Sequence, residues 1–413
     1  MSINDDIKIF RELAYEYREI CESSRQKELR GLWRKHNSLE KTEIPVVCSW
    51  DEGSNLADEL LATELRCSDQ RLVKYELFLR NSLYHNAMGD DWIYEPWLTV
   101  PVIKKYPQYR GRWGQIVEEQ RVGQAYITRP VIHTMDDMNK LVYTSHEVDE
   151  AATADLISFY EEALDGVLEI SVNRRPIYHG LGASDLSTSL AELLGFENMM
   201  VAMVEEPELV HALVTFLRDA VLKQYDETTE KRDWTAHGGW WENQGTPYCY
   251  DLPDPNPQLN FSSSKELWMF MAAQEFTLIS PEMFEEFMLQ YQRPIMERFG
   301  LVTYGCCEDL TDKISLLKTI PNLRRIGIAP VANVEECAKQ IEDKYVMSWR
   351  PNPATVCAFF DKEVVRSQIR RGLEESRGCR VDIMLKDVST VQGEPARLFE
   401  WVKIVRDEVS RIS

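Results

Sequence analysis

The stretch from Leu301 to Trp349 decides the fold, and it reads LVTYGCCEDLTDKISLLKTIPNLRRIGIAPVANVEECAKQIEDKYVMSW. Three short apolar runs of buried-strand type alternate in it with two segments of helical periodicity. Strands are predicted at 301–304, 325–329 and 345–349, and helices at 310–320 and 334–341. Pro321 ends the first helix, because proline cannot continue it. Strand and helix alternating at this spacing indicate parallel βαβ units.

The same alternation continues on both sides of this stretch. A further helix is predicted at 362–375 and a further strand at 380–385. Upstream, strand patterns occur at 44–48, 166–172 and 234–237, and 126–133 is either a strand or an irregular excursion. The count comes to about eight strands, which predicts a single (β/α)₈ TIM barrel, an α/β fold; an open doubly wound sheet is the alternative.

Two regions are predicted to lie outside the barrel itself. Apolar residues spaced by three and four over 5–35 predict an amphipathic helix, so that residues 1–40 form an N-terminal helical extension and 41–413 the barrel. We expect the extension to pack on the body of the protein or on a second subunit, which would make a homodimer. The region 66–129, rich in Tyr, Trp, Gly and Pro, is predicted to be an inserted loop layer, and 253–257 an extended loop.

Charge and composition exclude several classes of partner. The 413 residues include 47 basic and 68 acidic side chains, a net charge of −21, which disfavours binding to nucleic acid or to an anionic membrane. No apolar run approaches the roughly 20 residues of a membrane span, and the N-terminus lacks the pattern of a signal peptide. Nine cysteines scattered over a long chain favour reduced thiols, and we expect a cytoplasmic protein.

Catalytic groups of a barrel follow the carboxyl ends of its strands, which selects the residues just after each apolar run. The most chemically loaded of these segments is Tyr304–Asp309, which contains Cys306, Cys307 and Glu308. Its two thiols and its carboxylates, with His237 at another strand end, are a ligand set for zinc. In the alternative interpretation the cysteines are small residues that line a packed strand end, and no CxxC or HExxH spacing decides between the two.

Other strand ends supply further candidates. Lys386 and Asp387 follow the last strand and either face a site or form a structural ion pair across the barrel mouth. Trp50, Trp240 and Trp241 either wall an apolar pocket or belong to the core, and Arg174 either binds an anionic group or is surface charge. The chain has no GxGxxG, no Walker loop and no Gly-x-Ser-x-Gly elbow, which removes the usual support for dinucleotide, nucleotide and α/β-hydrolase functions.

The second half of the chain resembles the uroporphyrinogen decarboxylase superfamily. The resemblance is carried by Gln274-Glu275, Ser280–Phe287, Tyr291-Gln292, Tyr304–Glu308, Pro321–Ile326 and Ile383–Thr390. It implies a (β/α)₈ barrel. The arginine-rich segment that the decarboxylase has after its N-terminal strand is replaced here by Ser49–Gly53, with Asp51 and Glu52, where a substrate with many carboxylates would meet acid.

The other class in that superfamily comprises corrinoid-dependent methyltransferases, and the resemblance therefore implies methyl transfer. The methyltransferases carry a His-x-Cys zinc pair at the strand end where this chain has Tyr304, Gly305 and Cys306. The implied substrate is an O-methyl compound, above all an aromatic methyl ether, or an N-methyl compound, and the acceptor is Co(I) of a corrinoid carried by a partner protein.

The leaving oxygen or nitrogen must be protonated or bound to a Lewis acid as the methyl group departs. His237, Tyr304, Glu308 and Lys386 are the candidate acids; Cys306, Cys307, His237 and Glu308 are the candidate zinc ligands. Two alternatives remain: a decarboxylase of uroporphyrinogen or of a smaller acid that Arg174 or Arg175 would bind, and a barrel that binds a corrinoid or tetrapyrrole without turnover.

Overall fold

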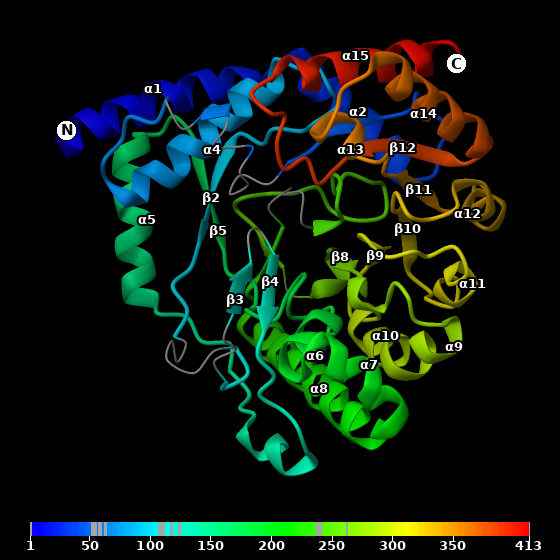
Figure 1. Ribbon diagram of the computed structural model, residues 1–413. Coiled ribbons are helices and arrows are strands. Elements are labelled where there is room, and N and C mark those ends of the chain that lie inside the picture. Colours follow the sequence, from blue (N-terminus) through cyan, green and yellow to red (C-terminus); the bar gives the residue numbers. More distant parts are fainter. Residues whose placement is uncertain are drawn as a thin grey trace.

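Six strands form one parallel sheet, and five of them, β8 to β12, are labelled in the right half of Figure 1. The computed structural model describes residues 2–50, 56, 60–61, 64–105, 112–115, 119–122, 125–236, 242–261 and 263–412, and for 119–122 and 125–128 only the backbone. The strands of the sheet are β1 (Val46–Cys48), β8 (Trp268–Met271), β9 (Leu301–Tyr304), β10 (Leu323–Ile328), β11 (Val346–Trp349) and β12 (Arg380–Leu385).

The strand order of this sheet is β1-β12-β11-β10-β9-β8, and each neighbouring pair is parallel. Five consecutive strands lie in chain order, and the first strand of the chain pairs with the last. This is the order of a barrel wall, and it lacks the reversal that marks a doubly wound sheet. All six carboxyl ends therefore lie along one edge of the sheet.

A closed eight-stranded barrel is not shown by the described residues. The remaining strands make three separate pairs: β2 (Trp97–Pro101) with β5 (Glu169–Asn173) in parallel, β3 (Glu119–Val122) with β4 (Ala125–Thr128), and β6 (Trp234–Thr235) with β7 (Asn260–Phe261), the last two antiparallel. Because β6 is two residues long and pairs with β7, no described ladder joins this half to β8 or β1. The fold is a mixed α/β fold with a barrel-like parallel wall.

The helices alternate with the strands in the second half of the chain, but the helix predicted at 310–320 is only Ile314–Leu317. The helices after β1 are α4 (Gln70–Asn86), α5 (Glu150–Leu164), α6 (Ser187–Leu194), α7 (Phe196–Glu205), α8 (Pro207–Lys231), α9 (Pro281–Phe284), α10 (Gln290–Met296), α11 (Ile314–Leu317), α12 (Val334–Ile341), α13 (Ala354–Cys357), α14 (Lys362–Glu375) and α15 (Ala396–Ser410). Strands β9 and β12 and helices α12 and α14 have the predicted bounds. No helix of the described residues is long and apolar enough to span a membrane.

Two sequence predictions need correction. The predicted inserted layer at 66–129 contains a regular helix, α4, and a buried strand, β2, that pairs with β5 over five residues. The predicted single N-terminal helix is two, α1 (Ile3–Cys21) and α2 (Ser24–Asn37), because the Ser23 side chain accepts a hydrogen bond from the Gln26 amide and starts a new helix.

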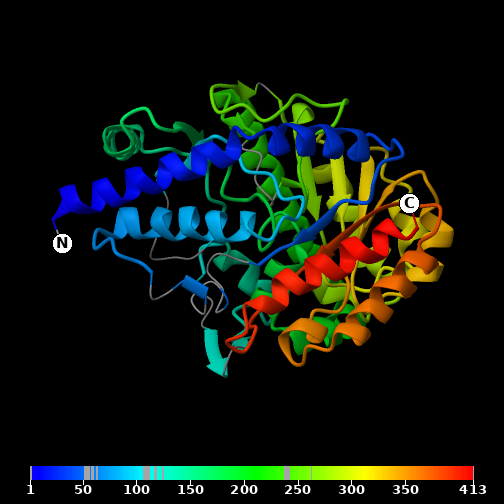
Figure 2. The same ribbon diagram turned by 90° about the horizontal axis from the view of Figure 1, so that it is seen from above.

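The N-terminal extension packs on the body of the same chain. Helix α1 lies against α4 and α5 (Figure 2). Its Phe10, Ala14 and Tyr17 side chains are buried in the apolar cluster that these helices share. Helix α2 buries Trp33, whose indole nitrogen donates to the backbone oxygen of Asp91 over 2.8 Å. Both helices are thus integral parts of the fold.

A buried charge network ties α2 to the sheet. The Arg325 guanidinium on β10 lies 3.0 Å from the Asp382 carboxylate on β12, and both are almost wholly buried. Asp382 also lies 3.0 Å from the His36 ring nitrogen and accepts a 2.7 Å hydrogen bond from the Ser348 hydroxyl. Burial by itself would raise the pKa of Asp382, but Arg325 and His36 outweigh it and the pKa is lowered. The carboxylate therefore stays charged inside the protein, held by partners from three elements.

Asp382→Asn should lower the free energy of unfolding by about 3–5 kcal/mol, because it leaves the Arg325 charge buried without its counter-charge. Urea denaturation followed by circular dichroism measures the change. The matched control is Asp343→Asn, whose exposed carboxylate lies 3.6 Å from Arg380 and should cost less than about 1 kcal/mol. Equal losses for the two variants would contradict the structural role given to Asp382.

Candidate active site

The carboxyl edge of the parallel sheet brings together two pairs of reactive side chains that are distant in sequence. Cys306 and Cys307 follow β9, and Lys386 and Asp387 follow β12. The Lys386 Nζ lies 3.0 Å from Cys306 Sγ and 3.5 Å from Cys307 Sγ. Strands β10 and β11 lie between β9 and β12, so this contact passes over their carboxyl ends. The four residues, which were selected because they follow strand ends, thus lie close together in the structure.

The four side chains differ in solvent exposure. Cys306 is buried and lies 3.6 Å, sulfur to sulfur, from Cys307, which is exposed. The Lys386 side chain is 11% exposed and its Nζ lies 3.1 Å from the Asp387 carboxylate, which is 55% exposed. The reactive sulfur of Cys306 is therefore one side chain below the surface.

Local backbone geometry fixes the position of Cys306. Gly305 has φ +106°, and a Cβ there would lie 2.7 Å from the Gly327 carbonyl oxygen, so the turn after β9 requires glycine. The Glu308 carboxylate is buried and accepts 2.8 and 2.7 Å hydrogen bonds from the amides of Cys306 and Ala273. These contacts hold the loop tightly against the end of β8.

Arg350, which follows β11, is the second cation of the site. Its guanidinium donates to the carbonyl oxygen of Cys306, and a Cβ on Gly327 would lie 2.8 Å from its Nη2. Because Gly327 has no side chain, the Arg350 guanidinium can occupy the space beside it. Sequence analysis gave Arg350 no role, although its place directly after a strand is the signal that selected Lys386.

The environment of Cys306 favours the thiolate. The hydrogen bond from Cys307 lowers the pKa of Cys306; burial opposes this, but the charges of Arg350 and Lys386 add to it, and the pKa falls to about 6. The pKa of Cys307 is raised, first by that same hydrogen bond and then by burial and the charge on Cys306. The two thiols thus hold one proton between them, and it stays on Cys307.

The pKa of Lys386 depends on this thiolate. Burial is the largest influence and lowers the pKa, but the charge of Cys306 is the next largest and raises it. Arg350 opposes Cys306, and Asp387 and Cys307 support it, so that the pKa is raised overall. These pKa shifts favour a thiolate–ammonium pair at the sheet edge.

A small buried apolar cluster adjoins the Cys306 side chain. Cys306 packs with Phe270 and Ala272 on β8 and its continuation, and with the partly buried Leu181. Sequence analysis missed Phe270, which lies within a fully buried strand and so carries no signal of its own.

The structure does not support the predicted roles of Tyr304 and Glu308. Tyr304 is fully buried in the cluster that contains Val302, and its hydroxyl donates to the Gln292 side chain over 2.7 Å. Cys306 belongs to a different cluster, so the phenol and the thiolate do not meet. Both Glu308 oxygens bond to backbone amides, which makes Glu308 a residue that positions the loop.

Trp50 and Arg174 also have structural partners. The Trp50 indole donates to Asn81 over 2.8 Å and its ring lies 4.7 Å from that of His85, within the core. Arg174 forms ion pairs with Glu150 and Asp233. Neither side chain is available to a substrate in this arrangement. The predicted His237, Trp240 and Trp241 lie outside the described residues.

The predicted zinc site is not assembled by the described residues. Cys306 and Cys307 supply two sulfur donors, but the sulfur of Cys306 contacts Lys386 and the oxygens of Glu308 are already bonded. No three His, Cys, Asp or Glu side chains of the described part of the chain could hold a metal ion. These residues do not fit zinc without His237, and no step below uses a metal ion of this chain.

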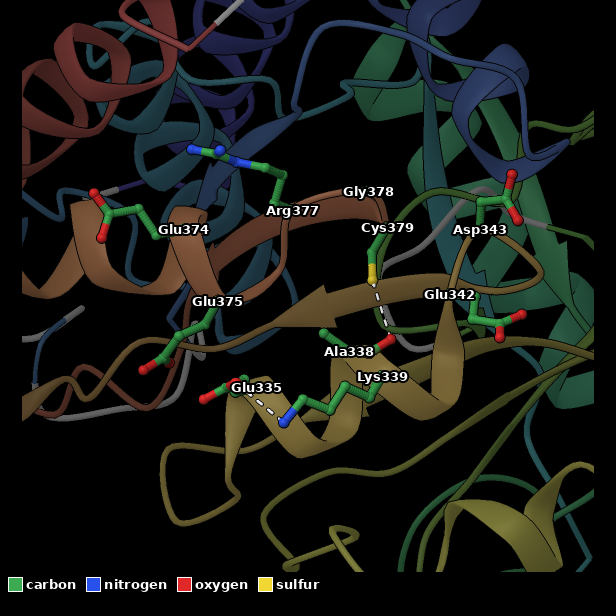
Figure 3. Close-up of a pocket in the computed structure, with 10 residues that line it drawn as sticks. All are labelled: Glu335, Ala338, Lys339, Glu342, Asp343, Glu374, Glu375, Arg377, Gly378 and Cys379. Carbon is green, nitrogen blue, oxygen red and sulfur yellow. Dashed lines mark hydrogen bonds and ion pairs between the residues drawn. The ribbon is translucent and has the colours of Figure 1, made fainter.

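A surface groove of about 670 Å³ lies at the opposite edge of the sheet (Figure 3). It is lined by residues of α12 and α14 and by Asp343 and Cys379, which precede β11 and β12. The Cys379 thiol donates to the Ala338 carbonyl oxygen. Because these residues lie at the amino ends of the strands, the groove is separate from the thiolate site.

Comparison with known proteins gives likenesses to solved structures only. No protein-family model matches the chain, and no curated protein matches it. A solved structure, a methyltransferase from Methanosarcina mazei, is similar with a TM-score of 0.48 and 11% sequence identity, over 93% of this chain and 98% of that one.

The rate of Cys306 alkylation by iodoacetamide should be proportional to the fraction of thiolate. It should therefore rise with pH around a midpoint near 6. Lys386→Met should move that midpoint upward, because it removes a charge that favours the thiolate. Mass spectrometry of the Cys306 peptide measures the rate, and Cys337, whose pKa burial raises to about 12, is the internal control. A midpoint at the ordinary thiol value of about 8.5 would contradict the proposed ionisation.

Proposed function

We propose that the protein is a methyltransferase that takes a methyl group from an O-methyl compound, above all an aromatic methyl ether, or from an N-methyl compound. The acceptor is Co(I) of a corrinoid carried by a separate protein. The observation that supports this proposal is the Lys386 ammonium held 3.0 Å from the Cys306 thiolate at the carboxyl edge of the sheet. That edge is where barrel-like α/β enzymes place their catalytic groups.

Demethylation of an ether requires a proton for the departing oxygen. A phenolate leaving group has a proton affinity close to that of lysine, since phenol and lysine side chains both have pKa values of about 10. An ammonium that touches the leaving oxygen can therefore donate to it as the bond to methyl breaks. Lys386 is the described side chain best placed for this step, because it is charged, mostly buried and at the strand edge.

The other residues of the site have distinct tasks in this proposal. Cys306 keeps Lys386 charged until the substrate arrives, and Arg350 fixes the carbonyl oxygen of Cys306. The partly buried Leu181, beside Cys306, provides an apolar contact for the methyl compound. The exposed Cys307 and Asp387 border the side from which the corrinoid protein would approach, because the methyl carbon and the acceptor must come within reacting distance.

The two arginines that the decarboxylase alternative would use are paired with acidic side chains. A decarboxylase would need a guanidinium that is open to a substrate carboxylate, but Arg174 pairs with Glu150 and Asp233, and Arg175 lies 2.9 Å from Glu242. A barrel that only binds a corrinoid or tetrapyrrole would have no use for an acid paired with a thiolate. Zinc, if it binds, would have to use His237 in addition to the thiols.

Purified protein mixed with a reduced corrinoid protein should methylate the cobalt when a methoxyaromatic or methylamine substrate is present. Absorbance spectroscopy detects the change from Co(I) to the methylated cobalt. Lys386→Met should lower the rate by about 10²–10⁴-fold, the range of general acid catalysis. Lys386→Arg should be nearly as slow, because arginine keeps the positive charge but does not release a proton.

The matched control is Lys339→Met, which removes an exposed lysine that pairs with Glu335 and Glu336. Lys339 lines the groove at the opposite edge of the sheet, and the rate of this variant should equal that of the unchanged protein. Absence of cobalt methylation with every methoxyaromatic and methylamine tested would overturn the proposed function. Release of CO₂ from a tetrapyrrole would instead favour the decarboxylase.

A further inference from the structure

We propose that Lys104 is an acylation site, whose amine takes an acyl group from a small thioester while His146 removes the proton. Lys104 follows β2 and Arg174 follows β5, so the site lies at the carboxyl ends of this parallel strand pair. Barrel-like α/β enzymes place their catalytic groups at such strand ends. The acylation site is independent of the proposed methyl transfer, because it shares no residue with the thiolate site.

Asp233, His146 and Lys104 form a hydrogen-bonded relay. The His146 Nε2 lies 2.9 Å from the Asp233 carboxylate, and the His146 Nδ1 lies 3.4 Å from the Lys104 Nζ. Because a carboxylate only accepts hydrogen bonds, Nε2 carries the ring proton and Nδ1 of the neutral ring presents a lone pair to the amine. Burial lowers the pKa of His146, which keeps the ring neutral. A base that touches a nucleophile and is oriented by a third group is the arrangement used in nucleophilic catalysis.

The hydrogen bonds of Lys104 match those of a neutral amine. Its Nζ donates to the Arg174 carbonyl oxygen over 2.8 Å, and within the described residues its other hydrogen-bond partner is His146 Nδ1. A neutral amine has two N–H donors and one lone pair, whereas an ammonium has three donors. With both N–H groups bonded to these two acceptors, the lone pair points away from them. Because the Lys104 side chain is only half-buried, a small electrophile can approach it from that side.

The carboxylates near Lys104 are bound to other groups. One oxygen of Asp233 contacts His146, and the other accepts a hydrogen bond from the Arg174 guanidinium. Glu150 binds the same guanidinium through both of its oxygens. Both acids are therefore held by Arg174 and His146 rather than by Lys104, and the ammonium form of Lys104 gains little from them.

The surrounding charges also favour the neutral amine. Lys231 is a further cation of this cluster, since its Nζ donates to a backbone oxygen within it. Burial is the largest influence on Lys104 and lowers its pKa. Asp233 and Glu150 oppose this, whereas Arg174 and Lys231 add to it, and the pKa falls to about 7. A large fraction of the amine is thus unprotonated at neutral pH, as nucleophilic attack requires.

The proposed reaction is a balanced acyl transfer. The lone pair of the Lys104 nitrogen forms a bond to the carbonyl carbon of the thioester, the bond from carbon to sulfur breaks, and its electron pair leaves with the sulfur as a thiolate. The nitrogen then carries an excess proton, which His146 Nδ1 takes. The Asp233 carboxylate stabilises the resulting imidazolium until the proton passes to the departing thiolate. The products are an amide on Lys104 and a free thiol.

Treatment of the full-length protein with S-acetyl-N-acetylcysteamine, a small acetyl thioester, tests the site. Hydroxylamine then removes acetyl groups from cysteine, and peptide mass spectrometry measures acetylation of Lys104 and of its exposed neighbour Lys105 as the pH is varied. At pH 7 about half of an amine with a pKa near 7 is neutral, against less than about one in a thousand for an ordinary lysine with a pKa of about 10.4. A less basic amine is also a weaker nucleophile, so we expect Lys104 to react about 50-fold faster than Lys105 or more, at a rate that becomes constant above about pH 8.

A His146→Asn variant tests the base. Asparagine keeps an acceptor oxygen near the position of Nδ1 but takes up no proton, so acetylation of Lys104 should slow by about 10²-fold, the lower end of general base catalysis, and that of Lys105 should not change. The matched control is His211→Asn, which removes a histidine on α8 that contacts the Tyr291 hydroxyl and should alter neither rate. An unchanged Lys104 rate in a folded His146→Asn protein, judged by circular dichroism, would contradict the role given to His146.

The unchanged protein alone can overturn the proposed site. Acetylation of Lys104 no faster than that of Lys105 at pH 7 would do so. A Lys104 rate that keeps rising up to about pH 10, as expected for an ordinary lysine, would do so as well.

Discussion

The parallel alignment of β1, β12, β11, β10, β9 and β8 is the constraint on which the site depends. Because the strands all run in one direction, residues that follow β9, β11 and β12 meet at one edge although they lie up to 80 positions apart in sequence. The Arg325–Asp382 ion pair holds β10 and β12 together beneath that edge, and His36 joins the N-terminal α2 to the same network. The N-terminal extension thus contributes to the wall that carries the reactive residues.

The position of the Lys386 ammonium beside Cys306 is explained by the opposite charges of the two groups. An unpaired charge below a protein surface is costly, and Cys306 and Lys386 each lower the cost of the other. Arg350 lowers the pKa of both Cys306 and Lys386. It therefore stabilises the thiolate and destabilises the lysine ammonium. A change of charge on either partner changes the proton affinity of the other, which is a useful property in a reaction that moves both a methyl group and a proton.

Much of the sheet and part of the site could be predicted from the sequence. The apolar runs gave β9 and β12 their bounds, and the rule that catalytic groups follow strand ends selected Cys306, Cys307, Lys386 and Asp387. The contact between Lys386 and Cys306 could not be predicted, because it depends on strand order and on the turn at Gly305. Tyr304 was predicted to be catalytic and is not at the site. It lies two residues after Val302, on the same face of β9, and that face packs against the helices. Strand β2 was missed because its aromatic and proline residues resemble those of a loop.

The chemistry proposed for the site requires that Cys306 is a thiolate paired with the Lys386 ammonium at neutral pH. The ultraviolet absorbance of the thiolate measures this directly when the unchanged protein is compared with Cys306→Ser during an acid titration. We expect an absorbance difference at pH 7 that disappears on acidification around a midpoint near 6. Identical spectra of the two proteins at pH 7 would contradict it.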